Sequence, residues 1–192
     1  MVVLTIILLL IIFYVSMALG SWLGTKNTVL YKLGERTYDS KLKQLETSAF
    51  FNPIRKYRER GAIYQMTLFL FPLILIKSIA FMAVSCFLIA PILLLFQGMT
   101  MGSLIRVMKD KQLYSKMLYR VIFWQLLGHV VAAAMGTYLG YKWLIGEQDF
   151  QWDWFGSTQA LLLFFVVVIT AWMAAYFESQ MILYEHQSKK SM

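Results

Sequence analysis

The side chains best placed to do chemistry are the few polar residues that interrupt long apolar stretches. Polar groups are costly inside hydrocarbon, so those that occur there are candidates for function. Arg106 lies at the end of an apolar stretch, where topology explains it, and Lys77 is expected near a turn, where its ammonium group reaches the membrane surface. The complete set of such residues is Lys77, Gln97, Arg106, Gln125, His129 and Glu178.

Two of these residues are predicted to form a pair. His129 lies about nine residues into its apolar stretch, which is roughly 14 Å at 1.5 Å per residue. Glu178 lies about six residues before the end of the next stretch, or roughly 9 Å deep. Because the depths are similar and the stretches consecutive, we predict that His129 and Glu178 pair, directly or through water. The pair would act either as a clamp between helices or as a proton-linked or substrate-contacting site.

The common motifs of hydrolytic enzymes do not occur in the sequence. There is no Walker phosphate loop, no HExxH zinc helix and no GxSxG elbow. His186 is the only other histidine, and Cys86 is the only cysteine. We therefore predict no catalytic residue, no metal and no cofactor, and an intramembrane enzyme that uses His129 is left open as a third function.

Long apolar stretches must position these polar residues. Of 192 residues, 59% are hydrophobic and 15% are charged, whereas soluble domains carry about 25% charged residues. About 20 apolar residues cross a hydrocarbon core of roughly 30 Å. We predict one all-α integral membrane domain over residues 1–192, a polytopic transmembrane bundle of five helices. Residues 62–105 would supply the second and third helices, as a tight or re-entrant pair.

Lysine and arginine predict the orientation of the bundle. All 18 except Lys77 and Lys142 lie in residues 25–61, in residues 106–120 or in the C-terminal tail. Residues 145–156 carry only acidic charges. The positive-inside rule places the basic segments in the cytoplasm and the acidic segment outside. The N-terminus is then outside and the C-terminus cytoplasmic, and the net charge of +8 reflects topology and lipid headgroups and not nucleic acid.

Residues 25–61 are predicted to form a cytoplasmic amphipathic and basic segment. Tyr38, Leu42, Leu45 and Ala49 recur at helical spacing, which is typical of a helix lying on a membrane. Asn52 and Pro53 predict the cap and first turn of a second helix that ends near Arg60. The segment is either an interfacial elbow or a docking surface for a partner. Its candidate contacts with lipid headgroups or a partner are Lys41, Lys43, Arg55, Lys56, Arg58 and Arg60.

Small residues recur at four-residue spacing in two apolar stretches. Such ridges let helices approach closely within a membrane. They serve either packing within one subunit or contact with a second copy or another partner. The predicted packing residues are Gly98, Gly102, Gly128, Ala132, Gly136 and Gly140.

Three short motifs resemble those of the stage II sporulation protein M-like membrane family. They are the QGMTMG segment at 97–102, Gly128-His129 with its later glycines, and the AAYFE segment at 174–178. The resemblance covers roughly residues 62–185. The sequence differs from the family pattern in having Gln97 in place of Asn and in the order of Gly128 and His129.

The resemblance implies a protein of the bacterial cytoplasmic membrane that works in a complex. One branch of the family acts in envelope remodelling with peptidoglycan-processing partners during sporulation. Another branch is encoded beside ABC-type ATPases in circular-bacteriocin clusters. The expected function is therefore that of a non-ATPase membrane subunit for export, maturation or immunity of a peptide, with an ATP-binding cassette partner. The alternative is a membrane scaffold for envelope-remodelling proteins.

Overall fold

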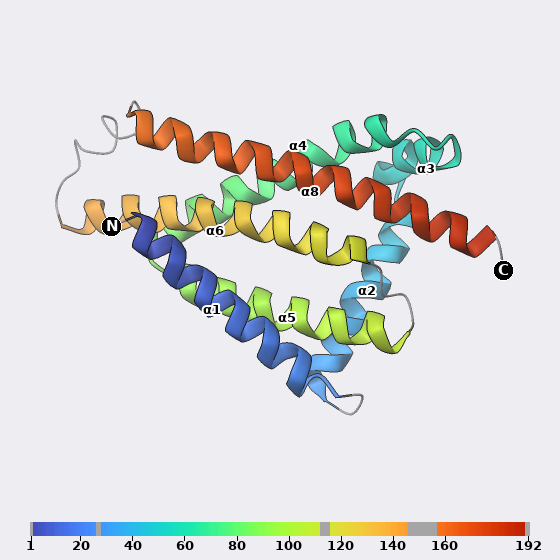
Figure 1. The fold of residues 1–192 in the computed structure, drawn as a ribbon, viewed down its shortest axis with the longest axis horizontal. Coiled ribbons are helices and arrows are strands. Elements are labelled where there is room, and N and C mark those ends of the chain that lie inside the picture. Colours follow the sequence, from blue (N-terminus) through green and yellow to red (C-terminus); the bar gives the residue numbers. More distant parts are fainter. Residues whose placement is uncertain (1, 26–27, 112–115, 146–156, 191–192) are drawn as a thin grey trace.

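The computed structural model describes residues 2–25, 28–111, 116–145 and 157–190 of the chain. All regular structure in these ranges is helical (Figure 1). The predicted acidic loop falls almost entirely within residues 146–156, which lie outside the described residues. The elements are α1 (Val2–Leu23), α2 (Val29–Thr47), η1 (Ala49–Phe51), α3 (Asn52–Glu59), α4 (Ile63–Ser85), α5 (Ala90–Asp110), α6 (Lys116–Leu144) and α8 (Thr158–Lys190).

Five of these helices are long and apolar enough to cross a membrane, as predicted: α1, α4, α5, α6 and α8. The second and third are both full-length helices joined by a short turn, but they do not pack as a pair: α4 packs on α6 and α8, and α5 packs on α1 and α2. α4 has 23 residues and α5 has 21, which correspond to roughly 34 and 31 Å of helix. The turn between them is short because Leu88 adopts a left-handed conformation, with φ 61°, that side chains of its size rarely accept.

The helices alternate in direction as the predicted order requires. α1 and α5 are parallel, since Gly98 faces Phe13 and Gly102 faces Met17. α4 and α6 are also parallel, since Met82 faces Gly136 and Cys86 faces Gly140. Both run opposite to α8, because Thr67 donates to Ser179 at 3.2 Å whereas Phe71, further along α4, contacts Trp172, which is earlier in α8. We call the end of the bundle that holds α2 and α3 the inner end. That this end faces the cytoplasm stays a prediction from charge.

The glycine ridges pack within the chain. A Cβ at Gly136 of α6 would overlap the backbone carbonyl of Met82 in α4, and one at Gly140 would overlap that of Cys86, the residue that follows α4. Ala132 is buried in the same helix. Gly98 and Gly102 of α5 meet the backbone of α1 in the same way. The residues predicted for helix packing therefore serve close approach between helices of one subunit.

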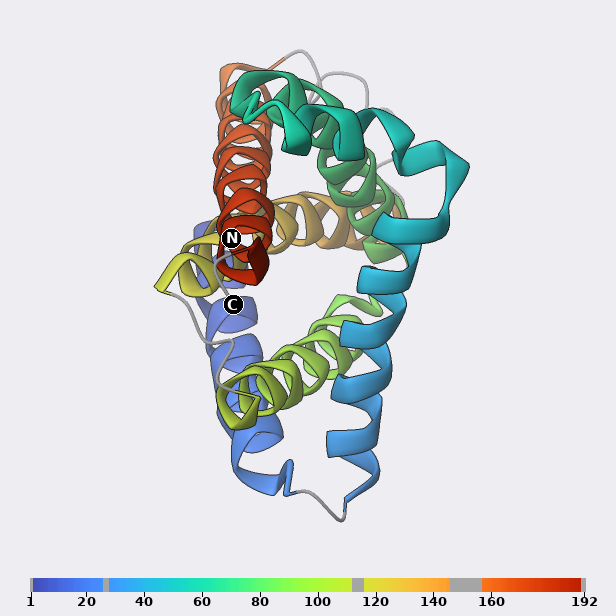
Figure 2. The same cartoon turned by 90° about the vertical axis from the view of Figure 1, so that its right-hand side faces the viewer.

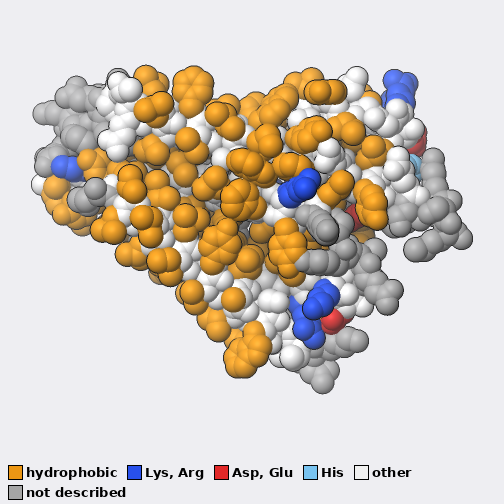
Figure 3. All heavy atoms as spheres, viewed as in Figure 1, with side chains coloured by type: hydrophobic (Ala, Val, Ile, Leu, Met, Phe, Trp, Pro, Cys, Tyr) orange, Lys and Arg blue, Asp and Glu red, His pale blue; other side chains and the backbone are white. Residues whose placement is uncertain are grey.

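Helix α6 is the central element of the bundle. In its most apolar window, 61% of residues are buried by protein, against 22% in α1 and in α4. It packs against α4 and α8, whereas α1 packs mainly along α5. The remaining apolar surface faces outward: hydrophobic side chains cover most of the face shown in Figure 3, while the Lys and Arg side chains visible there lie mostly in its inner half.

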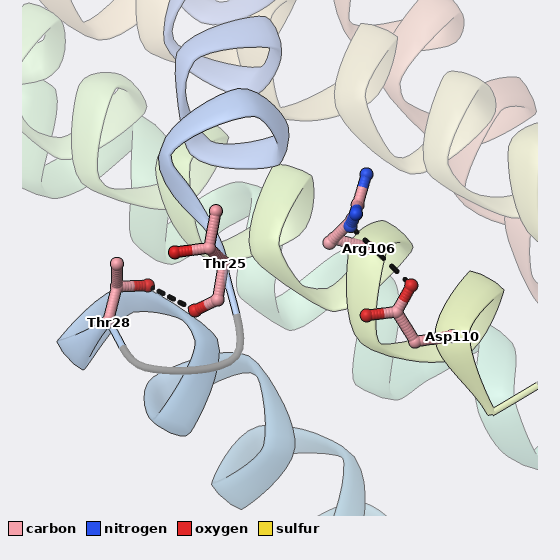
Figure 4. A network of polar contacts seen from close by, with 4 residues as sticks. All are labelled: Thr25, Thr28, Arg106 and Asp110. Carbon is pink, nitrogen blue, oxygen red and sulfur yellow. Dashed lines mark hydrogen bonds and ion pairs between the residues drawn. The ribbon is translucent and has the colours of Figure 1, made fainter.

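Helix α2 crosses one side of the bundle at the inner end. Figure 2 shows it running from the end of α1, past α5, to α3 and the start of α4. Thr28 caps α2 by accepting a hydrogen bond from the Tyr31 amide at 3.3 Å, and its hydroxyl donates to the Thr25 carbonyl at 2.8 Å. Figure 4 shows the Thr28–Thr25 hydrogen bond beside the Arg106–Asp110 ion pair, which measures 3.5 Å.

The predicted second short helix is confirmed as α3. The residue at its cap is Phe51 and not Asn52, because the helix begins one residue earlier than predicted. Gly61 has φ +66° and open space around it, so it lets the chain leave α3 and enter α4 at little steric cost.

Candidate functional site

A cavity of about 190 Å³ lies at the inner half of the bundle, between α2, α4, α5, α6 and α8. Each helix contributes one stripe of residues at the three-, four- and seven-residue spacing of a single helical face. Leucine, isoleucine, valine and methionine make up most of the wall. Polar side chains interrupt it at Tyr38, Lys41, Gln44, Lys77, Gln125, Glu178 and Glu185.

Lys77 lies in the middle of α4, and the expectation that it lies near a turn is wrong. The helix continues to Ser85, so Lys77 is roughly 21 Å from Ile63 and 12 Å from Ser85. Its side chain is exposed and lines the cavity. A lysine at the centre of a membrane helix costs about 2.5–3.5 kcal/mol on insertion scales. Such a residue is retained where it has a use inside the bundle.

The facing wall of the cavity is acidic. Glu178, Met181, Ile182 and Glu185 form one stripe on α8. Arg120 of α6 lies over the Phe177 ring, 5.5 Å from its centroid, which places Glu178 near the inner end of α6. Among the described residues, Glu178 makes no ion pair or hydrogen bond and Lys77 makes no ion pair. Lys77 and Glu178 therefore line the cavity without neutralising each other in contact.

His129 does not contact Glu178. Its Nδ1 lies 2.9 Å from the Gln97 amide nitrogen, and its ring stacks on Phe81 with centroids 4.7 Å apart. Gly128 packs against Thr170, and Glu178 is eight residues beyond Thr170, or roughly 12 Å along the helix. The predicted depths were misleading because α8 continues as a helix to Lys190, well past its apolar stretch.

The His129 cluster lies one helical turn beyond the cavity-lining residues Lys77 and Gln125. Phe81 follows Lys77 by four residues on α4, and His129 follows Gln125 by four on α6, so this layer is one turn deeper. His129 is buried at 2% exposure. Within the described part of the chain, its Nε2 and the Gln97 Oε1 lack hydrogen-bond partners.

The predicted contact residues of the basic segment have different environments. Arg55 has a structural role within the chain. Its Nη1 donates hydrogen bonds to the carbonyls of Glu46 at 2.7 Å and of Leu45 and Ser48 at 3.1 Å. A cation at a helix C-terminus is favourable. Lys56 and Arg60 are exposed and line a surface hollow on α3.

The other members of that set also separate by environment. Arg58 is partly buried, Lys43 is exposed on α2, and Lys41 lines the cavity. The residues that remain available on the outer surface are therefore Lys43, Lys56 and Arg60. We call α2, η1 and α3 together the platform.

The platform is fixed to α5 by contacts that sequence reasoning missed. Lys111 lies 3.1 Å from Glu35 and 3.7 Å from Asp39, and 5.4 Å above the Tyr38 ring. The hydrogen bond to Glu35 is the main cause of a raised pKa for Lys111. Burial raises the pKa of Tyr38 to about 12. The four-residue spacing of Glu35 and Asp39 puts both carboxylates on one helical face, and this was the sequence feature that could have predicted the contact.

Deeper contacts support the same attachment. The Ser103 hydroxyl donates to the Leu30 carbonyl, and Gly34 of α2 lies directly against Ser103 of α5. Close approach of the two backbones therefore holds α2 in place along its first half.

The lining groups can bind and orient charged ligands. No group of three metal-binding side chains occurs among the described residues, and the lining contains no cysteine, serine or histidine that could act as a nucleophile or base. The chain matches no protein-family model, no curated protein and no solved structure.

Proposed function

We propose that this chain is a non-ATPase membrane subunit of a multicomponent complex for export, maturation or immunity of an apolar, bacteriocin-like peptide. An ATP-binding cassette ATPase would be its partner. The observation that carries the proposal is an amphipathic cavity inside the bundle, one wall of which is the amphipathic helix α2. The resemblance to the stage II sporulation protein M-like family supports the same assignment.

The platform connects an outer surface to the cavity. Tyr38, Leu42 and Leu45 of α2 line the cavity, while Lys43 of the same helix is exposed. A partner that binds the outer side of α2 and α3 would therefore act on the cavity wall directly. An ATPase with an acidic docking surface is suited to this role, because rim charges steer association.

The test is a pull-down in mild detergent followed by mass spectrometry. We expect wild-type chain to recover an ATP-binding cassette subunit, and charge reversal of Lys43, Lys56 and Arg60 to glutamate to lose it. Lys142→Glu, at the opposite end of the bundle, is the matched control and should retain the partner. Recovery of peptidoglycan-processing enzymes alone would contradict the proposal.

That outcome would favour the alternative, a membrane scaffold for envelope-remodelling proteins. The same exposed platform favours this second function, since it offers a binding surface whatever the cavity holds. A scaffold needs no ligand in the bundle. Lys77→Gln and Glu178→Gln would then leave biological activity intact, whereas the peptide-handling function predicts that both reduce it.

A further inference from the structure

We infer that the cavity is a water-filled vestibule, which opens at the inner end of the bundle and gives water-soluble solutes access to Lys77 in the middle of α4. The class of occupant is water and small polar ions, and not lipid. Such a vestibule is compatible with either proposed function and rests on neither. It follows from the helical face that holds Lys77, from the charges around that residue and from the polar side chains of the wall.

Lys77 is exposed towards the cavity and not on the lipid side of α4. Leu70, Ile74 and Lys77 recur at four- and three-residue spacing and so share one face of the helix. Leu70 and Ile74 are buried, with 6% and 3% exposure, because that face packs inside the bundle. Lys77 is exposed on the same face because the cavity lies beside it. Ile76 lies on a different face and is 62% exposed.

No carboxylate of the described ranges forms an ion pair with Lys77. The Thr67–Ser179 hydrogen bond places Glu178 near the level of Thr67. Ten residues of α4 separate Thr67 from Lys77, which is roughly 15 Å along the helix. A lysine within a membrane either pairs with an opposite charge or faces a water-filled cavity. Water is therefore the partner that this position offers to the ammonium group.

Polar side chains mark the route from the inner end to Lys77. Lys41 and Gln44 of α2 line the cavity and are exposed, so they lie at its mouth. Glu178 lies between this mouth and Lys77, and Gln125 lies near the level of Lys77. A volume of about 190 Å³ holds on the order of ten waters at roughly 10–15 Å³ each. Such waters have several polar partners along the wall, which is what a hydrated cavity requires.

The packing of the helices explains why the cavity lies where it does. α5 packs on α1 and α2, whereas α4 packs on α6 and α8. In Figure 2, which looks onto the inner end, α5 is drawn below α6 and α8. Deeper in the bundle the two groups are joined, because the Gln97 amide nitrogen lies 2.9 Å from His129 Nδ1. The inner end is therefore the side from which we expect water to enter.

The test is cysteine accessibility on the full chain in sealed membrane vesicles, with Cys86→Ser as the background. The probe is a membrane-impermeant, cationic methanethiosulfonate reagent, added to right-side-out or to inverted vesicles. Lys43→Cys and Trp143→Cys report the two ends of the bundle, because both positions are exposed and lie at opposite ends. Each reacts in one vesicle preparation only, so the orientation of the chain is measured and not assumed.

Lys77→Cys should react in the same preparation as Lys43→Cys. Ile76→Cys is the matched control at the same depth, because it faces lipid, where the reactive thiolate does not form. We expect Lys77→Cys to react at least about a hundredfold faster than Ile76→Cys. Leu73→Cys, one turn nearer the inner end on the cavity face, keeps Lys77 in place and should also react faster than Ile76→Cys. It tests the vestibule even where circular dichroism shows that Lys77→Cys is misfolded.

Glu178 should set the charge preference of the same space. In Lys77→Cys, the Glu178 carboxylate favours approach of the cationic reagent over an anionic sulfonate reagent. Adding Glu178→Gln should lower the ratio of the two rates about threefold. Glu59→Gln, an equal change at an exposed position outside the cavity, should leave the ratio unchanged.

Several outcomes would overturn the vestibule. Equal rates for Lys77→Cys and Ile76→Cys would do so, as would reaction of Lys77→Cys in the preparation that labels Trp143→Cys. Protection of Lys77→Cys by added phosphatidylglycerol would assign the space to lipid. If the expected rates are found and no ATPase is recovered in the pull-down, the vestibule stands and the proposed complex fails. If the ATPase is recovered and Lys77→Cys and Leu73→Cys do not react, the vestibule fails alone.

Discussion

Replacing Gly136 with alanine should weaken the contact between α4 and α6. The added Cβ would overlap the Met82 carbonyl oxygen and lie 2.9 Å from both the carbonyl carbon of Met82 and the Ser85 Cβ. Two backbones cannot rotate out of the way, so the helices must separate by roughly 1 Å. A gap of that size forfeits about a quarter to a half of each affected dispersion contact. Overpacking of this kind typically costs about 1–3 kcal/mol.

Alanine also stabilises a helix interior by about 0.5–1 kcal/mol relative to glycine, so the expected net loss is about 1–2 kcal/mol. Gly128→Ala is the matched control, because its Cβ would meet side chains and no backbone: Thr170 Oγ1 at 2.7 Å, Thr170 Cβ at 3.4 Å and Ser78 Oγ at 3.7 Å. A side chain can change rotamer, so this variant should lie within about 0.5 kcal/mol of wild type.

The assay is unfolding by sodium dodecyl sulfate in mixed micelles, followed by far-UV circular dichroism and tryptophan fluorescence. Light scattering should show an unchanged oligomeric state, because the glycines of α6 pack against α4 of the same subunit and not against a second copy. The reasoning is refuted if Gly136→Ala is as stable as Gly128→Ala, or if Gly136→Ala changes the oligomeric state at unchanged helix content.

Three further predictions concern polar contacts. Arg55→Ala should destabilise the C-terminal turn of α2 by about 1 kcal/mol, seen as faster amide exchange there, while Lys56→Ala should not. Gln97→Leu should cost about 1–3 kcal/mol because His129 loses its hydrogen bond inside the bundle; a loss below 0.5 kcal/mol would count against that contact. Burial raises the pKa of Tyr38 from 10.0 to about 12, so its contribution to stability is complete below pH 10 and is lost towards pH 12. Difference absorbance against Tyr38→Phe should show one phenol titrating near 12, and a midpoint near 10 would contradict its burial.

The membrane helices and their alternating directions could be predicted because hydrocarbon thickness sets helix length and cationic loops set orientation. The platform could be predicted in outline because Tyr38, Leu42 and Leu45 stand out among charges. In both cases the contrast between apolar and charged residues is visible along the sequence itself, without knowledge of tertiary contacts.

The cavity could not be predicted, because it depends on which helix faces meet in three dimensions and the sequence does not show this. α8 is apolar on every side, so periodicity does not tell which face holds Glu178 and Glu185. The position of His129 depends on the register between helices, which Gly128 and Thr170 set through tertiary contact. Lys77 was misplaced because an apolar run of 44 residues does not show where its turn lies until Leu88 is seen to reverse the chain.

The pairing of α1 with α5 has a consequence for biosynthesis. α1 leaves the ribosome well before α5, and at roughly 5–20 residues per second the delay is several seconds. During that interval α1 must tolerate lipid on every side. Its composition suits this wait, since it contains no charged residue and has the highest mean hydropathy of the five helices, 3.0. α6, which packs its glycines against α4 and buries His129, follows α4 in the chain and therefore emerges after it.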